Sequence, residues 1–332
     1  MSSDLTVLNL GLITLRSELP MHKGLYCDIY RLAALPALRS GSGYGLQDMS
    51  TNVVTNSLLF FSIYAAIDGG QLQRVVKRFR LNHHGGDVQT GFNNLLDALS
   101  NIRAAAPGAF EHQYITPFDI LNANERTLLG PQPTLTLVTP FYHQGDILNY
   151  GKRCSQAHKL SLLIQAAKAL EHLHRNDVVH GHVYPGNIYI TDTGHATVTD
   201  ALVYTLASQY ILHPHATIPV QNSFVYQARE RLWPGTDIFV LPAKPSDVYA
   251  FASIIYAVLT GNPPFQGSSH RILLRAVAEI LMHGHLQIRK PSNDIMGDTL
   301  WALVQRCWAH DPGARFTMED VVIALQDIEF SD

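Results

Sequence analysis

Two oxygen-bearing side chains, Asn187 and Asp200, flank two short runs that have the pattern of strands. Residues 188–190 (IYI) and 196–199 (ATVT) are apolar enough for short strands, and residues 191–194 (TDTG) have the composition of a turn. Asn187 directly precedes the first run and Asp200 directly follows the second, which places both at the mouths of adjacent strands. Because amide and carboxylate oxygens are ligands of hard cations, the sequence predicts that these two oxygens meet one cation.

This stretch resembles the catalytic centre of a protein kinase, in which H-R-D-L-x-x-x-N is followed by D-F-G. Here residues 180–187 read HGHVYPGN and residues 200–202 read DAL. The first histidine of the motif (His180) and the metal-binding positions (Asn187 and Asp200) are kept, but His182 stands where the family has its catalytic aspartate. The resemblance therefore implies a kinase fold with a damaged chemical centre, a pseudokinase.

The replaced residues bear on phosphoryl transfer. A neutral imidazole at position 182 can accept a proton, but it lacks the negative charge of an aspartate. Tyr184 replaces the lysine that steadies the transferring phosphate in the family. Since general-base catalysis is worth roughly 10²–10⁴ in rate, we expect activity far below the roughly 1–100 per second of ordinary kinases. The alternative, an active non-standard protein kinase that transfers the γ-phosphate of ATP to Ser, Thr or Tyr, stays open because Lys77, Asn187 and Asp200 remain.

Lys77 is the candidate for the phosphate-binding lysine. Residues 58–66 and 74–80 read as strands around a turn at 68–70, and V-V-K-R-F resembles the family's V-A-I-K strand. The alternative is a solvated lysine on an edge strand. The helix expected at 88–106 lacks the glutamate that pairs with this lysine in kinases, since Asn93 or Asn94 occupies the position.

Other nucleotide-binding candidates are weaker. Residues 24–31 resemble the end of the glycine-rich loop with Gly24 as its middle glycine, although residues 41–45 are richer in glycine. Strands are expected at 115–122 and 134–142, and the second resembles the hinge, with Thr139 at the gatekeeper position. The resemblance thus implies possible binding of ATP and Mg²⁺ by Lys77, Thr139, Gly24, Asn187 and Asp200.

The C-terminal half carries the more specific motifs. Helices are expected at 158–174, 246–259, 270–283 and 300–308, with a last helix after residue 317. The resemblance implies a pair between Glu230 and Arg315, and an Asp247 that braces the catalytic loop. Residues 201–223 read as a loop, and its hydroxyl side chains are possible phosphosites: Tyr204, Thr205, Ser208, Tyr210 and Thr217. Because the phosphate-docking arginine of the family is Gly181 here, we do not expect phospho-activation through this loop.

These elements together predict a two-lobed α+β fold, with a small, mainly β N-lobe that has one helix and a larger, mainly α C-lobe. We expect a lead-in at 1–20, the N-lobe at 21–144 with an insertion at about 33–57, and the C-lobe at 145–332. The motif C-W-x-x-D-P-x-x-R at 307–315 resembles the tyrosine-kinase-like group.

Composition limits the partners. The net charge of -3 shows no basic excess, so nucleic acid is not expected. No run is long and apolar enough to cross a membrane, and three widely spaced cysteines fit a reducing compartment. We expect an intracellular protein, cytoplasmic or nuclear, that acts on a protein partner or a partner kinase as a scaffold or allosteric regulator in signalling.

Overall fold

The computed structural model describes residues 22–23, 28–30, 60–68, 71–80, 88–120, 135–210, 224–232, 240–264 and 288–329. Contacts divide the chain into two units. The first comprises Met1–Asp97, Pro117–Phe141 and Tyr210–Leu212, and the second comprises Ala98–Thr116, Tyr142–Gln209 and His213–Asp332. Gly24, the insertion at 33–57, Thr217 and the helix expected at 270–283 lie outside the described residues. The lobe boundary at 144/145 remains a prediction.

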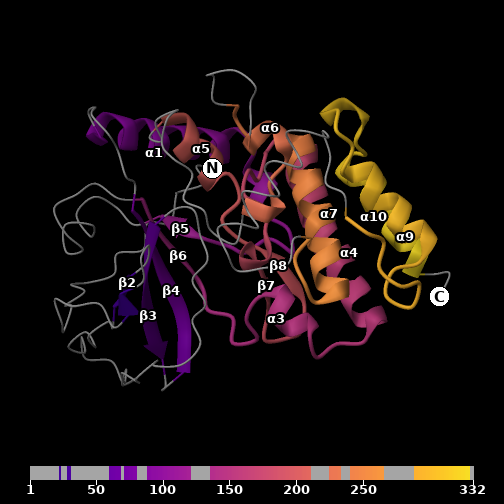
Figure 1. Cartoon of the computed structure of the whole chain (residues 1–332). Helices are drawn as coiled ribbons and strands as arrows, with labels where there is room; N and C mark the ends of the chain where they lie inside the picture. The colour runs from indigo at the N-terminus through magenta and orange to yellow at the C-terminus, as the bar shows by residue number, and fades with distance from the viewer. Residues whose placement is uncertain are drawn as a thin grey trace. The chain divides into compact units, whose positions relative to one another are not determined.

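The first unit contains a sheet with the strand order β1-β2-β3-β4-β6-β5. Strands β3 (Phe60–Asp68) and β4 (Gln71–Arg80) pair antiparallel around residues 69–70, which confirms the predicted hairpin, and they are the two long strands in Figure 1. The remaining strands are β1 (His22–Lys23), β2 (Asp28–Tyr30), β5 (Asp119–Ile120) and β6 (Leu135–Pro140).

Two predicted strands differ in length from what the sequence indicated. The strand expected at 134–142 is β6, and it pairs antiparallel with β4. The strand expected at 115–122 is shorter in the described residues, where β5 covers only Asp119–Ile120. Ile115 forms an isolated bridge to Val198. Pro117 stands between them and has no N–H to donate to a ladder, which accounts for the interruption.

Helix α1 (Val88–Ala105) confirms the helix expected from apolar spacing. Phe92, Leu95 and Leu99 recur every three or four residues and are fully buried. The helix ends just before Pro107, which begins the 3₁₀ turn η1 (Pro107–Phe110), since the residue before a proline disfavours helical backbone.

The second unit is mainly helical. Helix α4 (Gln156–Arg175) is capped at its N-terminus by Ser155, whose Oγ accepts from the His158 N–H at 3.2 Å. Helix α7 (Lys244–Thr260) contacts α4. Gly261 follows its last residue in the left-handed conformation, with φ of 75°, which glycine adopts without strain because it has no Cβ. The other helices of eight or more residues described after it are α9 (Asp298–Cys307) and α10 (Met318–Glu329), and α10 packs on α4 and α9.

Short elements connect these helices. They are α3 (Ile147–Gly151), η3 (Pro185–Asn187), β7 (Ile188–Ile190), β8 (Ala196–Val198), η4 (Phe224–Tyr226), α6 (Arg229–Leu232) and η5 (Pro312–Ala314). Strands β7 and β8 pair antiparallel as expected. In the part of the chain that the structure describes, no helix is both long and apolar enough to span a membrane.

The prediction of a loop after Asp200 is wrong for eight residues, because Val203–Tyr210 forms helix α5. Val203, Leu206 and Ala207 are buried, and their spacing is helical. Buried backbone must have hydrogen-bond partners, and a helix provides them within the segment. The helix carries three of the predicted phosphosites with described side chains, and Tyr204 among them is buried.

Candidate functional site

The β7–β8 hairpin brings the two predicted metal ligands to one end. Ile188 pairs with Val198, and the Thr199 N–H donates to the Asn187 carbonyl at 3.0 Å, so Asn187 and Asp200 leave the hairpin side by side. Asn187 is held by its own amide, which donates from Nδ2 to the His182 carbonyl at 2.9 Å. Asp200 has a left-handed backbone, with φ of 61°, and its Oδ1 accepts from Thr199 Oγ1 at 2.9 Å.

This pair suits a hard cation that is shared with a ligand. Mg²⁺ is commonly held by one or two carboxylates together with phosphate oxygens, rather than by a cage of protein groups. Across the described ranges, no cluster of three or more His, Cys, Asp or Glu side chains could hold a metal ion alone. The amide oxygen of Asn187 and the carboxylate of Asp200 would therefore need further oxygens, from water or from a bound molecule, to complete the coordination of a cation.

His180 is a structural histidine with both ring nitrogens engaged. It is fully buried, its Nε2–H donates to the Thr199 carbonyl at 3.0 Å, and its Nδ1 accepts from the His182 N–H at 3.2 Å. Burial lowers the pKa of its imidazole, against the opposing charges of Asp247 and Asp200. The neutral ring therefore links the loop at 180–182 to the residue after β8.

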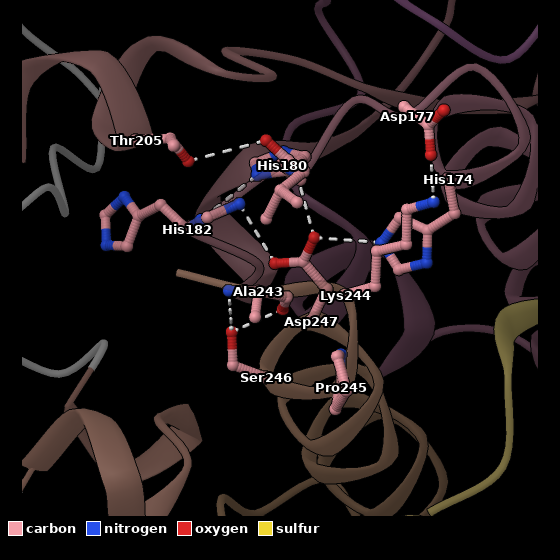
Figure 2. A network of polar contacts seen from close by, with 12 residues as sticks. His174, Asp177, His180, His182, Thr205, Ala243, Lys244, Pro245, Ser246 and Asp247 are labelled. Carbon is pink, nitrogen blue, oxygen red and sulfur yellow. Dashed lines mark hydrogen bonds and ion pairs between the residues drawn. The ribbon is translucent and has the colours of Figure 1, made fainter. Parts of the chain in front are cut away.

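Asp247 braces the same loop from the first turns of α7, as expected (Figure 2). Its Oδ2 accepts from the His180 N–H at 2.8 Å and from His174 Nε2–H at 3.0 Å, and its Oδ1 accepts from the Gly181 N–H at 2.9 Å. The carboxylate is buried. One side chain thus fixes two backbone amides of the loop and the end of α4.

His182, at the position of the family's catalytic aspartate, is 5% exposed. Its ring lies between two tyrosine rings, with centroid distances of 4.6 Å to Tyr184 and 4.9 Å to Tyr204. In Figure 2 the imidazole points away from Asp247. Its Nδ1 lies 3.4 Å from Asn187 Nδ2, whereas its Nε2 is buried and has no hydrogen-bond partner among the described residues.

The surroundings of His182 make it a weak base. Burial, followed by the nearby His180 and Arg231, lowers its pKa to about 3. A general base works best with a pKa near the working pH, so this imidazole accepts a proton poorly at neutral pH. The expectation that a neutral imidazole could serve as the base is therefore not supported by its environment.

Tyr184 fills the place of the family's phosphate-steadying lysine with a ring. It is buried, and burial raises the pKa of its hydroxyl well above the usual value. The ring lies against Gly186, where an added Cβ would come within 2.6 Å of it. The position therefore offers no cation to a phosphate.

The pair between Glu230 and Arg315 is present and bidentate. Arg315 Nη1 and Nη2 donate to the two carboxylate oxygens at 2.7 and 2.9 Å. The same guanidinium donates from Nε to the Ala309 carbonyl and from Nη1 to the Pro245 carbonyl, both at 2.9 Å. This arrangement ties α6 to the start of α7 and to the segment before α10.

Lys77 and Thr139 belong to the first unit. Lys77 lies in β4 opposite Ile63 of β3 and Leu137 of β6, so β4 is not an edge strand and the edge-strand alternative is wrong. Thr139 lies opposite Val75 and is buried. In α1, Asn93 and Asn94 are both exposed.

Sequence reasoning missed three contributors to the site. Tyr204 and Thr205 were assigned to a loop, although the apolar spacing of 203–210 was a readable helical signal. His174 was treated only as the end of a helix, and nothing in its local sequence indicates its bond to Asp247, which lies far along the chain.

Comparisons with known proteins agree with this geometry. The family model described as "Protein kinase domain" matches residues 109–324. Serine/threonine-protein kinase PrkC of Bacillus subtilis (strain 168) is 32% identical over 49% of this chain, and serine/threonine-protein kinase PkaA of Streptomyces coelicolor is 28% identical over 50%. A putative serine/threonine-protein kinase/receptor, R818, of Acanthamoeba polyphaga mimivirus is 27% identical over 59%. The matches cover 24%, 28% and 11% of these three relatives, respectively.

Proposed function

The chain belongs to the protein kinase family, and from this premise we propose that it is a pseudokinase that acts by binding a protein partner. In this proposal it serves as a scaffold or allosteric regulator in signalling, and a partner kinase is the expected class of partner. The observation that carries the proposal is His182, whose buried ring has a pKa of about 3 where a kinase keeps an exposed carboxylate.

Two further features support this proposal. A kinase needs a residue that orients the attacking hydroxyl and charges that neutralise the phosphoryl group. His182 presents no atom to solvent that could orient a hydroxyl, since its Nε2 is buried. Tyr184 adds a neutral, buried ring at the position of a cation. The loop therefore lacks both a residue that can orient the hydroxyl and the cation that the family places at position 184.

We also propose that Mg²⁺ and ATP bind without being turned over. Asn187 and Asp200 would share the cation with the phosphates, and Lys77, Gly24 and Thr139 would contact the nucleotide by analogy with the family. A ligand at about 100 times its dissociation constant stabilises the folded state by roughly 2.7 kcal/mol. We expect a rise in melting temperature with Mg-ATP that is lost in both Lys77→Ala and Asp200→Ala. No shift in the wild type would contradict nucleotide binding.

Phosphoryl transfer itself tests the pseudokinase proposal. Wild-type protein is incubated with γ-labelled ATP, Mg²⁺ and a mixture of generic Ser, Thr and Tyr substrates, beside Asp200→Asn as the matched control. We expect equal, background labelling in the two proteins. Labelling by the wild type that disappears in Asp200→Asn would overturn the proposal.

The second candidate is an active, non-standard protein kinase that transfers the γ-phosphate to Ser, Thr or Tyr. The paired oxygens of Asn187 and Asp200 favour it, because they suit a catalytic cation as well as a bound one. The relatives named above are described as serine/threonine-protein kinases, which makes Ser and Thr the first acceptors to try. The same labelling assay decides between the two candidates.

Two finer assignments accompany the proposal. We place the chain in the tyrosine-kinase-like group on the C-W-x-x-D-P-x-x-R motif at 307–315, and clustering of the matched region with members of each kinase group tests that placement. We also propose an intracellular location, cytoplasmic or nuclear, which fractionation of cells that make the protein would test.

A further inference from the structure

Two histidine rings join helix α4 to the segment at 107–116, which begins with η1. His112 follows η1, and His172 lies in the last turn of α4. Their ring centroids are 4.8 Å apart and the rings are inclined by 22°, a stacked geometry. His172 also bonds η1 itself, since its Nε2 lies 2.8 Å from the Gly108 carbonyl oxygen. All three residues belong to the second unit.

The hydrogen bonds fix where the protons of this pair lie. A carbonyl oxygen only accepts, so Nε2 of His172 carries a hydrogen and donates it to Gly108. The Tyr114 N–H donates to His112 Nδ1 at 3.3 Å, so that nitrogen carries no hydrogen and Nε2 of the neutral ring does. His172 can therefore take up a second proton, on Nδ1, and keep its bond. His112 can take one up only on Nδ1, where the new hydrogen would face the N–H of Tyr114.

The groups around the pair also favour a neutral His112. Burial, followed by His172 and Lys168 of α4, lowers the pKa of the His112 imidazole. Two protonated rings stacked at 4.8 Å would repel each other. The other charged or titratable groups on the elements packed here are Glu171 and Arg175 of α4, which pair with each other, Glu111 and Tyr114 of the segment, and His195 of the β7–β8 turn, whose ring lies 6.3 Å from that of Tyr114.

Tyr114 connects the pair to strand β8. Its carbonyl accepts from the Val198 N–H at 2.8 Å, and the Val198 carbonyl accepts from the Thr116 N–H at 2.8 Å. Ile115, between them in the chain, forms the isolated bridge to Val198. Tyr114 is therefore held by His112 at its N–H and by β8 at its carbonyl.

We propose that His112 and His172 form a proton-sensitive clasp, which ties residues 107–116 to α4 and β8 while His112 is neutral and weakens when His112 takes up a proton. The pair accepts one proton, on His172, and a second proton breaks the bond from Tyr114. The inference goes beyond the proposed function, because it needs neither a nucleotide nor phosphoryl transfer. Acidification would loosen the support of β8, the strand that precedes Asp200.

The direction and size of the effect follow from proton linkage. The pKa of His112 is lowered from 6.5 on folding, so the open segment binds the proton more readily than the closed one as the pH falls. The contribution of the clasp is therefore complete above pH 6.5 and decreases below it. At pH 5.5 an ordinary imidazole is protonated about ten times as often as it is neutral, so local opening is favoured by up to about tenfold.

The experiment measures hydrogen exchange by mass spectrometry in the full chain at pH 7.5 and pH 5.5. Each rate is divided by that of the same peptide in the urea-unfolded chain at the same pH, which removes the intrinsic effect of pH. His112→Asn keeps an oxygen acceptor near the place of Nδ1 but does not titrate, and His195→Asn is the matched control at an exposed histidine. On acidification, we expect protection of 107–116 and 196–198 to fall about threefold to tenfold more in the wild type and His195→Asn than in His112→Asn.

Two outcomes of this comparison would overturn the proposal. They are an equal change of protection in the wild type and His112→Asn, or a loss in the wild type that His195→Asn abolishes. Since His182 is present in all three proteins, its own titration contributes equally to each. If His112→Asn does not fold, ¹⁵N spectra of the wild-type imidazoles decide. A His112 ring at pH 6 with hydrogen on Nε2 alone supports the clasp, whereas a His112 imidazolium in a segment that stays protected overturns it.

Discussion

At the scale of single residues, His180 and His182 are two buried imidazoles with different surroundings. Both nitrogens of His180 have hydrogen-bond partners, whereas the Nε2 of His182 has none among the described residues. An unsatisfied buried polar atom costs about 1–3 kcal/mol, and a bonded one stabilises modestly. Replacing each imidazole by an apolar ring should therefore lower the free energy of unfolding at position 180 and should not lower it at position 182.

We expect His182→Phe to leave the free energy of unfolding unchanged or to raise it by about 1 kcal/mol, because the ring stack stays and an unpaired nitrogen goes. His180→Phe is the matched control and should lower it by about 2 kcal/mol or more, since the Thr199 carbonyl and the His182 N–H lose their partner. Urea denaturation at neutral pH measures both. A larger loss for His182→Phe than for His180→Phe would contradict this assignment.

The pH dependence of stability follows from the same residue. The pKa of His182 is lowered from 6.5 to about 3 on folding, so the unfolded chain binds the proton more readily between these values. Stability from this group is therefore complete above pH 6.5 and is lost as the pH falls toward 3.

Between pH 6.5 and 5.5 the wild type should lose about 1 kcal/mol more stability than His182→Phe, because the phenylalanine cannot take up a proton. Denaturant melts of the two proteins at both pH values give the difference. Parallel losses in the two proteins would show that His182 does not titrate as its burial implies.

At the scale of elements, Arg315 connects three segments through one planar group. It bonds both oxygens of Glu230 and the carbonyls of Ala309 and Pro245. A lysine has one point charge and cannot reproduce this fork.

We expect Arg315→Lys to lower the free energy of unfolding by about 2 kcal/mol, because Arg315 is buried and Glu230 only partly so, and the lysine keeps a charge but loses the bidentate geometry. Lys290→Gln is the control, since Lys290 pairs with an exposed Asp298 and should matter by less than about 1 kcal/mol. Thermal or urea unfolding of both variants checks the contrast. Equal effects would mean that the bidentate pair contributes no more than a surface pair.

The elements also show which features the sequence could predict. Helices α1, α4 and α9 have apolar stripes with helical spacing, and the hairpins have turn residues between apolar runs, so local patterns sufficed. Helix α5 carries several hydroxyl residues after a turn, and its stability comes from contacts with the loop at 179–182. The spacing of its buried residues was a helical signal, but the contacts that hold the helix have no signature in the local pattern.

The site was predictable to the same extent. The roles of Asn187, Asp200, Asp247 and the Glu230–Arg315 pair were expected from the resemblance of their motifs to those of protein kinases. The structure places Asn187 and Asp200 at the end of the β7–β8 hairpin, bonds Asp247 to the loop and pairs Glu230 with Arg315. The protonation of His182 was not predictable, because its pKa depends on burial between rings from distant parts of the chain. The residue type at position 182, a histidine, is compatible with a general base. The packing around its ring argues against that role.

At the scale of the whole molecule, Cys307 offers a reporter of global unfolding. It is buried in α9, and burial raises the pKa of its thiol to about 12. Only the thiolate reacts with alkylating reagents. Folding therefore protects Cys307 in two ways, because burial keeps the reagent away and the raised pKa keeps the thiol protonated.

We expect iodoacetamide at pH 8 to leave Cys307 unmodified in the native protein and to modify it in urea. Mass spectrometry of the tryptic peptides gives the extent, with the half-buried Cys154 of the same chain as the comparison. Rapid native alkylation of Cys307 would indicate that α9 opens without global unfolding.

The space at Gly181 also limits which sequences are reachable from this one. Since a Cβ there would meet Thr205 Oγ1 at 2.1 Å, any side chain at 181 requires the Thr205 side chain or the backbone beside it to shift. A smaller residue at 205 removes the Oγ1 contact and leaves Pro242, at 3.1 Å, as the next neighbour of that Cβ. The two positions are therefore coupled, and the effect of a substitution at 181 depends on the residue at 205.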